Sequence, residues 1–579
     1  MDETFDVVVC GGGLAGLCIA RQVRREMPAL RVAVVEPTRR PLPEACLKIG
    51  ESSVELGSHY FEKTLGLTEY LRERHLLKNG LRFFPGGGHL PLAQRTEIGP
   101  PELPIVPSFQ IDRGRFENDL RDMVVEDGVK LFEGRRVEDL ILSETGELHQ
   151  VVLDEGELRT KWVVDASGRR RLIVRKLGNQ ADLPHHASSS WFRIEGKLDI
   201  ADLVPKSDKR WHAADGDHIR WLSTNHLMGE GYWVWIIPLP TNYTSIGIVV
   251  HDEVHPFETF NTLDKTQEWL RRHEPVLADA LSGYEVADFL VLRDFAYTAT
   301  KVYSTDRWAC VGEAGVFVDP FYSPGSDLIA LANTLATECI RADLEGDDFE
   351  ARVEANDSFY LRFIREATET YRQSAKAYGN PLVMAPKIYW DNINYWAFAC
   401  QFFFQEIYRL PLADQAPFLD LAARFSAQHA RAQDIFAFWA ERATGETKPA
   451  HIVLPPVPSV LATMHRDLAK EMTPAETLDY METHYAVAQD AFADILVRAL
   501  ASLGPEDGAA LVRELGVAEW DLERIEGRLA AEHGEGKRRR RLPKVVRDLE
   551  RTIGRADVHQ SFGELARVGE LFGLGRART

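Results

Sequence analysis

The chain has 579 residues, more than one hydrophobic core normally supports, so two or three domains are expected. Its composition, with 45% hydrophobic and 27% charged residues, is that of a folded protein, and its net charge of −20 argues against a nucleic-acid partner. Six scattered cysteines without a C-x-x-C pair indicate neither a zinc site nor a disulfide framework, so no metal is expected.

The first predicted unit consists of a strand, a turn, a helix and a second strand. Phe5–Cys10 is a short run rich in β-branched residues and predicts a buried strand. Leu17–Met27 predicts a helix, and Arg31–Glu36 predicts a strand that ends on an acid. This order is typical of a βαβ unit in a parallel sheet.

A glycine pattern, Gly11-x-Gly13-x-x-Gly16, lies between that first strand and the helix. Such glycines permit a tight turn and let a pyrophosphate approach the helix N-terminus, where unpaired N–H groups and the helix dipole favour an anion. Glu36, at the end of the next strand, is placed to accept hydrogen bonds from ribose hydroxyls. The sequence therefore predicts a dinucleotide site.

Strands and helices then separate along the chain. The residues from Trp191 to Val250 alternate like an antiparallel sheet, and Asp327–Leu344 predicts a long helix. Beyond about Asp347 the pattern is almost wholly helical through Phe572. Further strands are expected at Lys130–Phe132, Val151–Leu153, Lys161–Val164 and Asp306–Val311.

Three features stand out in the helical part. The aromatic-rich stretch Ile388–Leu410 favours a helix packed against the sheet domain over a direct role in substrate binding. His451–Pro458 is Pro-rich and predicts a linker. Lys537–Arg541 is a basic run, which we interpret as a solvated linker rather than a contact with nucleic acid or anionic lipid.

No signal peptide is recognisable in the sequence, because acidic residues follow Met1 directly. The apolar run Tyr232–Pro240 is far too short to span a bilayer, and no longer candidate is present. We therefore expect a cytoplasmic protein without a membrane span.

Two later segments point to the nucleotide. Asp165-Ala-Ser-Gly168 resembles the D-A-S-G segment of the para-hydroxybenzoate-hydroxylase-like flavoproteins. Gly312-Glu313-Ala-Gly315 is similar to the G-D motif that touches the flavin ribityl chain in that superfamily, with Glu313 in place of the usual aspartate. The resemblance implies FAD rather than NAD.

Four further motifs resemble the flavin-dependent halogenases. They are Gly50-Glu51-Ser52, Gln110-Ile-Asp112-Arg113, Trp233-Val-Trp235-Ile-Ile-Pro238 and Phe317-x-x-Pro320-x-x-Ser323-x-Gly325. The resemblance implies that FADH₂, O₂ and chloride or bromide yield hypohalous acid, which halogenates an electron-rich aromatic substrate. Because the chain has no second G-x-G-x-x-G, a separate flavin reductase should supply FADH₂.

The same resemblance implies an α/β fold. Residues 1–190 and 295–345 should form a Rossmann-type FAD-binding domain, with an inserted antiparallel-sheet substrate domain at 191–294. A helical region, 346–450, should pack on the catalytic core and a C-terminal helical region, 451–579, should follow. These last helices could close the active site, form a homodimer or dock a carrier protein.

The resemblance also implies roles for individual residues. Lys78 matches the lysine that activates hypohalous acid; the competing candidate, Lys48, is better placed to contact the flavin, and the alternative for Lys78 is a surface lysine. Trp233 and Trp235 would keep organic substrate away from the flavin, or would be plain sheet core. Ser323 and Gly325 would bind halide. From all these motifs together, the residues expected to bind FAD are Gly11, Gly13, Ala15, Gly16, Glu36, Lys48, Glu51, Ser52, Arg113, Asp165, Gly312, Glu313, Pro320 and Gly325.

Two positions depart from the family pattern. Pro324 lies in the middle of the halide turn and has no N–H to donate. Tyr322 stands where the tryptophan-halogenating branch has a glutamate, which favours a phenolic, pyrrolic or carrier-bound substrate over free tryptophan. The acidic net charge disfavours an acidic carrier protein as partner.

Two alternatives to halogenation follow from these residues. Pro324 favours a flavoenzyme that does not halogenate, such as a hydroxylating monooxygenase or an isoprenoid-type reductase. A flavin-binding protein without catalysis is the other alternative, because resemblance of fold alone does not prove activity.

Overall fold

The computed structural model describes residues 2–43, 48–144, 146–215, 219–346, 348–443, 451–453, 459–515, 522–532 and 542–556. The basic run 537–541 lies outside the described residues, as do Cys46 and residues 454–458 of the predicted linker. The five cysteines that are described are all buried and free. In the described residues, no helix is both long and apolar enough to cross a membrane.

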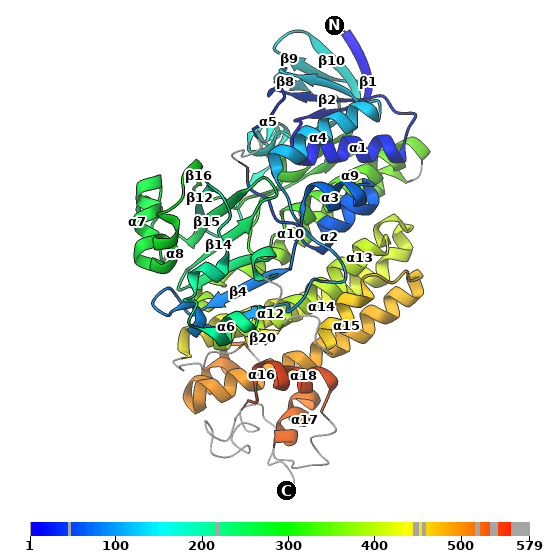
Figure 1. Cartoon of the computed structure of the whole chain (residues 1–579). Helices are drawn as coiled ribbons and strands as arrows, with labels where there is room; N and C mark the ends of the chain where they lie inside the picture. The colour runs from blue at the N-terminus through cyan, green and yellow to red at the C-terminus, as the bar shows by residue number, and fades with distance from the viewer. Residues whose placement is uncertain are drawn as a thin grey trace.

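A largely parallel sheet forms the N-terminal end of the molecule (Figure 1). Its strands are parallel through the centre, and Cys10 at the end of β1 lies in register with Val35 and Asp165 on its two neighbours. The carboxyl ends of these strands therefore meet at one edge, where a doubly wound sheet binds its ligand. The strand order is β18 (Tyr303–Ser304), β19 (Trp308–Cys310), β10 (Glu157–Asp165), β1 (Asp2–Cys10), β2 (Val32–Glu36) and β7 (Lys130–Glu133), with β9 (His149–Leu153) pairing β10 and β8 (Val137–Ile141) pairing β9.

A second, mostly antiparallel sheet follows in the middle of the molecule (Figure 1). Its order is β16 (Val286–Leu292), β12 (Ala187–Glu195), β15 (Tyr243–His251), β14 (Tyr232–Pro238), β13 (Thr224–Gly229), β4 (Leu81–Pro85), β5 (Glu97–Gly99) and β20 (His451–Val453). The sheet thus includes strands from well before residue 191. β20 lies within the predicted linker, so that part of the linker prediction is wrong: it pairs in parallel with β5 at the sheet edge.

Helices surround both sheets. Next to the parallel sheet lie α1 (Leu14–Glu26) and α4 (Arg113–Glu126), and α7 (Leu263–His273) and α8 (Pro275–Leu281) lie beside the second sheet (Figure 1). Shorter elements complete the N-terminal part: α2 (Glu55–His59), α3 (Thr68–Arg74), α5 (Leu172–Leu177), α6 (Lys209–Ala213) and the two-stranded pairs β3 (Leu76–Leu77) with β6 (Phe109–Gln110) and β11 (Gln180–Ala181) with β17 (Thr298–Ala299).

The C-terminal part is helical, as predicted, and packs against the rest through one continuous apolar core. The aromatic stretch 388–410 is not a single helix: α12 passes into a π-helical turn, η8, and then into α13. This segment packs against α14, α16 and α2. The helices are α9 (Gly325–Glu345), α10 (Phe349–Arg372), α11 (Ala375–Tyr378), α12 (Pro381–Asn394), η8 (Tyr395–Ala399), α13 (Cys400–Phe404), α14 (Leu412–Arg442), α15 (Val460–Asp467), α16 (Pro474–Leu515, kinked at Gly504), α17 (Leu522–Glu532) and α18 (Lys544–Ile553).

Candidate active site

The glycine loop links β1 to α1 and is closely packed on two sides. A Cβ on Gly16 would lie 1.9 Å from the carbonyl oxygen of Gly11, and one on Gly11 would lie 2.3 Å from that of Ala166. Gly11 also has φ +119°, a conformation that side chains disfavour. A Cβ on Gly13 would meet nothing within 4 Å. Gly16 and Gly11 are therefore required by the turn itself, while Gly13 leaves open space at the helix N-terminus.

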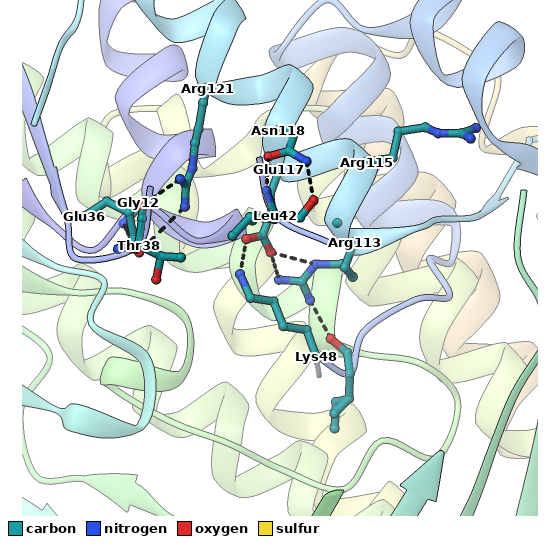
Figure 2. A network of polar contacts seen from close by, with 12 residues as sticks. Gly12, Glu36, Thr38, Leu42, Lys48, Arg113, Arg115, Glu117, Asn118 and Arg121 are labelled. Atoms are coloured by element: carbon teal, nitrogen blue, oxygen red, sulfur yellow. Dashed lines mark hydrogen bonds and ion pairs between the residues drawn. The ribbon is translucent and has the colours of Figure 1, made fainter. Parts of the chain in front are cut away.

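Glu36 is already engaged with the glycine loop (Figure 2). Its Oε2 accepts from the backbone N–H of Gly12 at 2.7 Å, and its Oε1 accepts from that of Thr38 at 2.8 Å. Arg121 of α4 lies 3.6 Å from the same carboxylate. The acid that we expect to bind ribose is thus held by backbone donors and one cation.

A second charged group lies across from Glu36, at the start of α4 (Figure 2). Arg113 donates to Glu117 Oε1 at 2.6 Å and to the carbonyl of Ile49, and Lys48 Nζ donates to Glu117 Oε2. Burial raises the pKa of Glu117, but Arg113 and Lys48 outweigh it and hold that pKa below its usual value. Glu117 was missed by our sequence reasoning, although its position four residues after Arg113 is a regular helical ion-pair spacing.

Asp165 and Glu313 occupy two different settings. Asp165 is fully buried and accepts from the backbone N–H groups of Ser167 at 3.0 Å and Ile173 at 2.8 Å, so it fixes the turn after β10. Glu313 is partly exposed, and burial raises its pKa while Arg169, Arg113 and Lys48 lower it. Glu313 is therefore near positively charged side chains, including Arg113 and Lys48. Asp165 instead holds the backbone of the turn after β10.

A small cavity of about 80 Å³ gathers the motifs that are far apart in the sequence. Its lining includes Gly50, Glu51, Ser52, Trp233, Trp235, Pro320, Ser323 and Gly325. Glu51 is tied to Arg193 of β12, whose Nε donates to Oε1 at 2.8 Å, and burial raises the pKa of Glu51. Arg193 is a further residue that no sequence motif indicated.

The two tryptophans are both buried and both face this cavity. Trp235 is 5% exposed, and its Nε1 donates to Ser245 Oγ at 3.0 Å. Trp233 is 2% exposed, and its ring lies 5.5 Å from Phe321 and 5.3 Å from His226. They are sheet core and cavity wall at once, so the two interpretations of this motif do not exclude each other.

The turn that carries Ser323 has left-handed backbone at Tyr322 and Ser323, with φ 68° and 60°. The N–H of Ser323 donates to the carbonyl of Pro320 at 2.9 Å, within the turn. Pro324 is the N-cap of α9, so Gly325 is the first residue of that helix and its N–H has no helical partner. A Cβ on Gly325 would meet nothing within 4 Å, so there is open space beside this residue where it lines the cavity.

Lys78 follows β3 and is 0% exposed, so the surface-lysine alternative does not hold. Its Nζ donates to Ser52 Oγ and to the carbonyl of Ser53, each at 2.8 Å. Burial lowers the pKa of Lys78 to about 7, although Glu55 and Asp327 act to raise it. Ser52 also accepts from Ser323 Oγ at 3.2 Å, which links Lys78 to the turn that carries Ser323 and Gly325.

A larger cavity of about 240 Å³ is lined by residues that neighbour Lys78. It shares three lining residues, Val318, Pro324 and Leu328, with the smaller cavity. Two residues near Lys78 also line the larger cavity. Gly80 follows Lys78 by two residues in the chain, and the carbonyl of Ser108 accepts from the backbone N–H of Lys78. The aromatic segment from α12 to α13 forms much of its wall as well as packing against neighbouring helices, and whether it binds substrate stays a prediction.

Comparisons with known proteins agree with this geometry. The family model described as tryptophan halogenase matches residues 92–366. Flavin-dependent halogenase chlA of Dictyostelium discoideum is 29% identical over 432 residues, which is 68% of this chain and 70% of that protein. In sequence the chain is therefore similar to the flavin-dependent halogenases, and its activity is that of a flavin-dependent halogenase.

Other halogenases match over similar lengths. The 1H-pyrrole-2-carbonyl-[peptidyl-carrier protein] brominase of Pseudoalteromonas luteoviolacea is 25% identical over 354 residues, 60% of this chain and 80% of that protein. The crystal structure of halogenase PltM in complex with phloroglucinol and FAD shares the fold, with a TM-score of 0.59, 14% identity, and coverage of 84% of this chain and 96% of that one. The protein of 579 residues is thus an FAD-dependent halogenase. The predicted mixed α/β fold with a helical C-terminal region is confirmed.

The residues of this halogenase fit the parts of FAD. The open space at Gly13 and the first N–H groups of α1 suit a pyrophosphate, and Glu36 suits a ribose. Arg113 and Lys48 provide positive charge near Ile49, and the smaller cavity lies next to them. When bound, reduced FAD supplies the chemistry that converts O₂ and halide to hypohalous acid.

A cluster of three buried polar residues, one of which lines the smaller cavity, belongs to no motif recognised in the sequence. His185, His251 and Asp319 place side-chain atoms able to bind metal within 4.8 Å of one another. His185 Nε2 and Asp319 Oδ2 are 2.8 Å apart, and Asp319 Oδ1 accepts from the N–H of Phe321 at 2.8 Å. These contacts fix the loop that carries Pro320 and Ser323, which is the role the structure supports.

Proposed function

We propose that this halogenase acts on a free, electron-rich aromatic molecule of the phenol class, which binds in the larger cavity beside Lys78. The position of Lys78 carries the proposal: it is buried, its Nζ donates to Ser52 of the motif-lined cavity, and its backbone N–H donates to Ser108 of the second cavity of about 240 Å³. Lys78 thus touches the walls of both cavities, where it can meet hypohalous acid that passes from the flavin side to the substrate side. A pocket of this size is suited to a small aromatic molecule.

The proposed role of Lys78 is to hold and activate hypohalous acid. Its neighbours Ser52 and Ser53 accept its hydrogen bonds and leave an N–H free to donate to the acid's oxygen. Near neutral pH its pKa of about 7 makes it a ready proton donor. The halide would bind at the open N–H of Gly325 and beside Ser323, so Pro324 moves the donor by one residue instead of abolishing the site.

The nature of the cavity supports a phenol. Most of its wall is apolar or aromatic, with Phe83, Phe359, Trp396 and Phe402 among the lining residues. Asp327 and Glu55 stand near Lys78 as polar groups that could recognise a hydroxyl. The Pseudoalteromonas luteoviolacea brominase is named for a substrate bound to a peptidyl-carrier protein, whereas the net charge of −20 here disfavours an acidic carrier. A separate flavin reductase is the proposed partner.

The proposal is tested with purified protein, FAD, a generic flavin reductase, NADH and phenol, with and without bromide or chloride. Halogenated phenol should form only with halide, and Lys78→Met should abolish it while Lys265→Met, an exposed lysine, should not. A hypohalite trap in the same reactions reports whether hypohalous acid still forms. Flavin reduction by NADPH without the reductase, together with hydroxylated but unhalogenated product in saturating bromide, would overturn the proposal in favour of a monooxygenase.

A further inference from the structure

Two buried carboxylates stand next to Lys78, and both line the larger cavity. Glu55 begins α2 and is 9% exposed, and Asp327 lies in the first turn of α9 and is 6% exposed. The carbonyl that accepts from Lys78 belongs to Ser53, two residues before Glu55. Asp327 Oδ1 accepts from the N–H of Gly57 in the same short helix at 2.8 Å. The three ionisable groups are therefore arranged around one turn of chain, residues 52–57.

The two carboxylates have different partners. Glu55 Oε1 lies 3.1 Å from Nε2 of His465, whereas Asp327 Oδ2 accepts from the neutral hydroxyl of Tyr395 at 2.7 Å. Burial raises the pKa of Glu55, but His465 outweighs it and leaves that pKa below its usual value. Burial raises the pKa of Asp327 to about 7. Carboxylates whose environments drive their pKa values apart take different roles in acid–base chemistry.

Halogenation of an aromatic ring requires a group that accepts a proton. When the ring takes up the halogen, its substituted carbon keeps a hydrogen that must leave as a proton. Two other polar residues of the cavity, His429 and Asp391, belong to a hydrogen-bond network of their own that runs through Gln433. His429 has both ring nitrogens in hydrogen bonds, to Thr370 and Trp390, and burial lowers its pKa to about 4. Asp391 accepts from Tyr322, Lys387 and Gln433.

We propose that Asp327 is the catalytic base that accepts the ring proton, while Glu55, held by His465, stays anionic as the charge partner of Lys78. The assignment rests on the proposed function, because it requires an aromatic substrate in the larger cavity. It deepens that proposal by placing the proton acceptor on the cavity side of Lys78. No motif that we identified contains either carboxylate.

The proposed step balances as follows. The π electrons of the ring form the carbon–halogen bond while the halogen–oxygen bond of hypohalous acid breaks. The oxygen leaves with that electron pair and takes a proton from the Lys78 ammonium, which gives water. Asp327 then takes the proton from the halogenated carbon, and the electrons of that C–H bond restore the aromatic ring. The proton finally passes from Asp327 to the neutral Lys78 amine, so the sum is ring C–H plus hypohalous acid to ring C–X plus water.

The return of the proton is favoured by the matched environments of the two groups, each with a pKa near 7. The groups packed around them do not compete. Burial holds the pKa values of Tyr395, Tyr371 and Cys400 well above their usual range and lowers that of His226 to about 3, so all four are neutral at pH 7. The negative charge of Glu55 acts on both Lys78 and Asp327.

The proposal also gives the C-terminal helices a place in the reaction. Tyr395 and His465 lie on η8 and α15, beyond the residues 92–366 that match the family model. Each holds one of the two carboxylates. The helical region thus completes the acid–base site in addition to walling the cavity.

The test compares Asp327→Asn, Tyr395→Phe and the unaltered protein with phenol and ring-deuterated phenol. Asp327→Asn should lower ring halogenation by about 100-fold or more, because the general base is lost. It should also produce a primary isotope effect that the unaltered protein lacks, since proton removal becomes rate-limiting. Tyr395→Phe removes the hydrogen bond to Asp327 but keeps the carboxylate, so it should show no isotope effect. The hypohalite trap should be halogenated at a similar rate in all three.

Several outcomes would overturn the assignment. Equal rates of phenol halogenation by Asp327→Asn and the unaltered protein would exclude Asp327 as the base. A large loss in Asp327→Asn with no isotope effect, matched by the same loss in Tyr395→Phe, would show a structural role only. Absence of halogenated phenol from the unaltered protein is a different result: it would overturn the proposed function, and this assignment with it.

Discussion

The flavin end and the substrate end of this halogenase both bury charged side chains, but they treat the charge differently. At the flavin end, Glu117 meets Arg113 and Lys48 (Figure 2), and Glu51 meets Arg193. At the substrate end, Lys78 and Asp327 make their hydrogen bonds to neutral groups, the serines 52 and 53, Gly57 and Tyr395. Glu117, which meets two cations, has its pKa held below the usual value, whereas burial drives Lys78 and Asp327, whose hydrogen-bond partners are neutral, toward neutrality.

This difference separates binding from proton transfer. A cofactor that must be held in one orientation while it reacts needs fixed donors and acceptors, which ion pairs provide. A site that must give and take a proton at neutral pH needs groups whose two forms have similar free energy.

The largest effect is expected in the glycine loop. Gly16→Ala should abolish FAD binding and destabilise the fold, because the new Cβ would lie 1.9 Å from the carbonyl oxygen of Gly11. Overpacking of this kind costs roughly 1–3 kcal/mol or more. Gly13→Ala is the matched control: it should keep the unfolding temperature, since its Cβ meets nothing within 4 Å, and weaken FAD binding alone. Thermal unfolding without FAD and a flavin-fluorescence titration measure the two effects. Equal unfolding temperatures for both variants would contradict this packing argument.

The next largest effect is on the pH profile of halogenation. Activity needs Lys78 as the ammonium and Asp327 as the carboxylate, and both have a pKa of about 7. The rate should therefore peak near pH 7, falling below it as Asp327 takes a proton and above it as Lys78 loses one. Asp327→Asn should remove the acid limb and move the alkaline limb to lower pH, because the negative charge that raises the pKa of Lys78 is gone. An unchanged acid limb in this variant would assign that limb to another group.

How far the sequence could predict each end follows from the same contrast. The βαβ unit, Glu36 and the motif residues that line the smaller cavity are local patterns whose spacing can be recognised along the chain. Lys78 could be predicted from its distance to the Gly50-Glu51-Ser52 motif, but that spacing does not predict that the side chain is buried. Glu55 and His465 are 410 residues apart and meet only after the helices fold, so no spacing predicts that pair. Asp327, two residues beyond Gly325, had a weak signal, because an acid in the first turn of a helix is common.

A moderate effect is expected for the acid at the glycine loop. Glu36→Ala should weaken FAD binding about tenfold, because the ribose would lose an ionised acceptor worth about 1.5 kcal/mol. Glu133→Ala is a suitable control, since Glu133 ends the neighbouring strand and also pairs with Arg121, but accepts no hydrogen bond from the glycine loop. Titration of both variants with FAD decides the point. A similar loss of affinity in Glu133→Ala would mean that Arg121, rather than Glu36, carries the effect.

The smallest effect distinguishes the two tryptophans. Trp235→Phe should lower the free energy of unfolding by about 1 kcal/mol beyond the loss in Trp233→Phe, because the Nε1–H of Trp235 donates to Ser245 and its removal breaks that bond. In the described part of the chain the Nε1 of Trp233 has no hydrogen-bond partner, so its replacement leaves no acceptor unsatisfied. Ser245 also lowers the pKa of Glu51 by hydrogen bonding to it, so Trp235→Phe should loosen the Glu51–Arg193 pair at the flavin end. Chemical unfolding of both variants gives the difference in stability. Equal losses would mean that ring packing against the cavity, and not the hydrogen bond, sets the contribution of this motif.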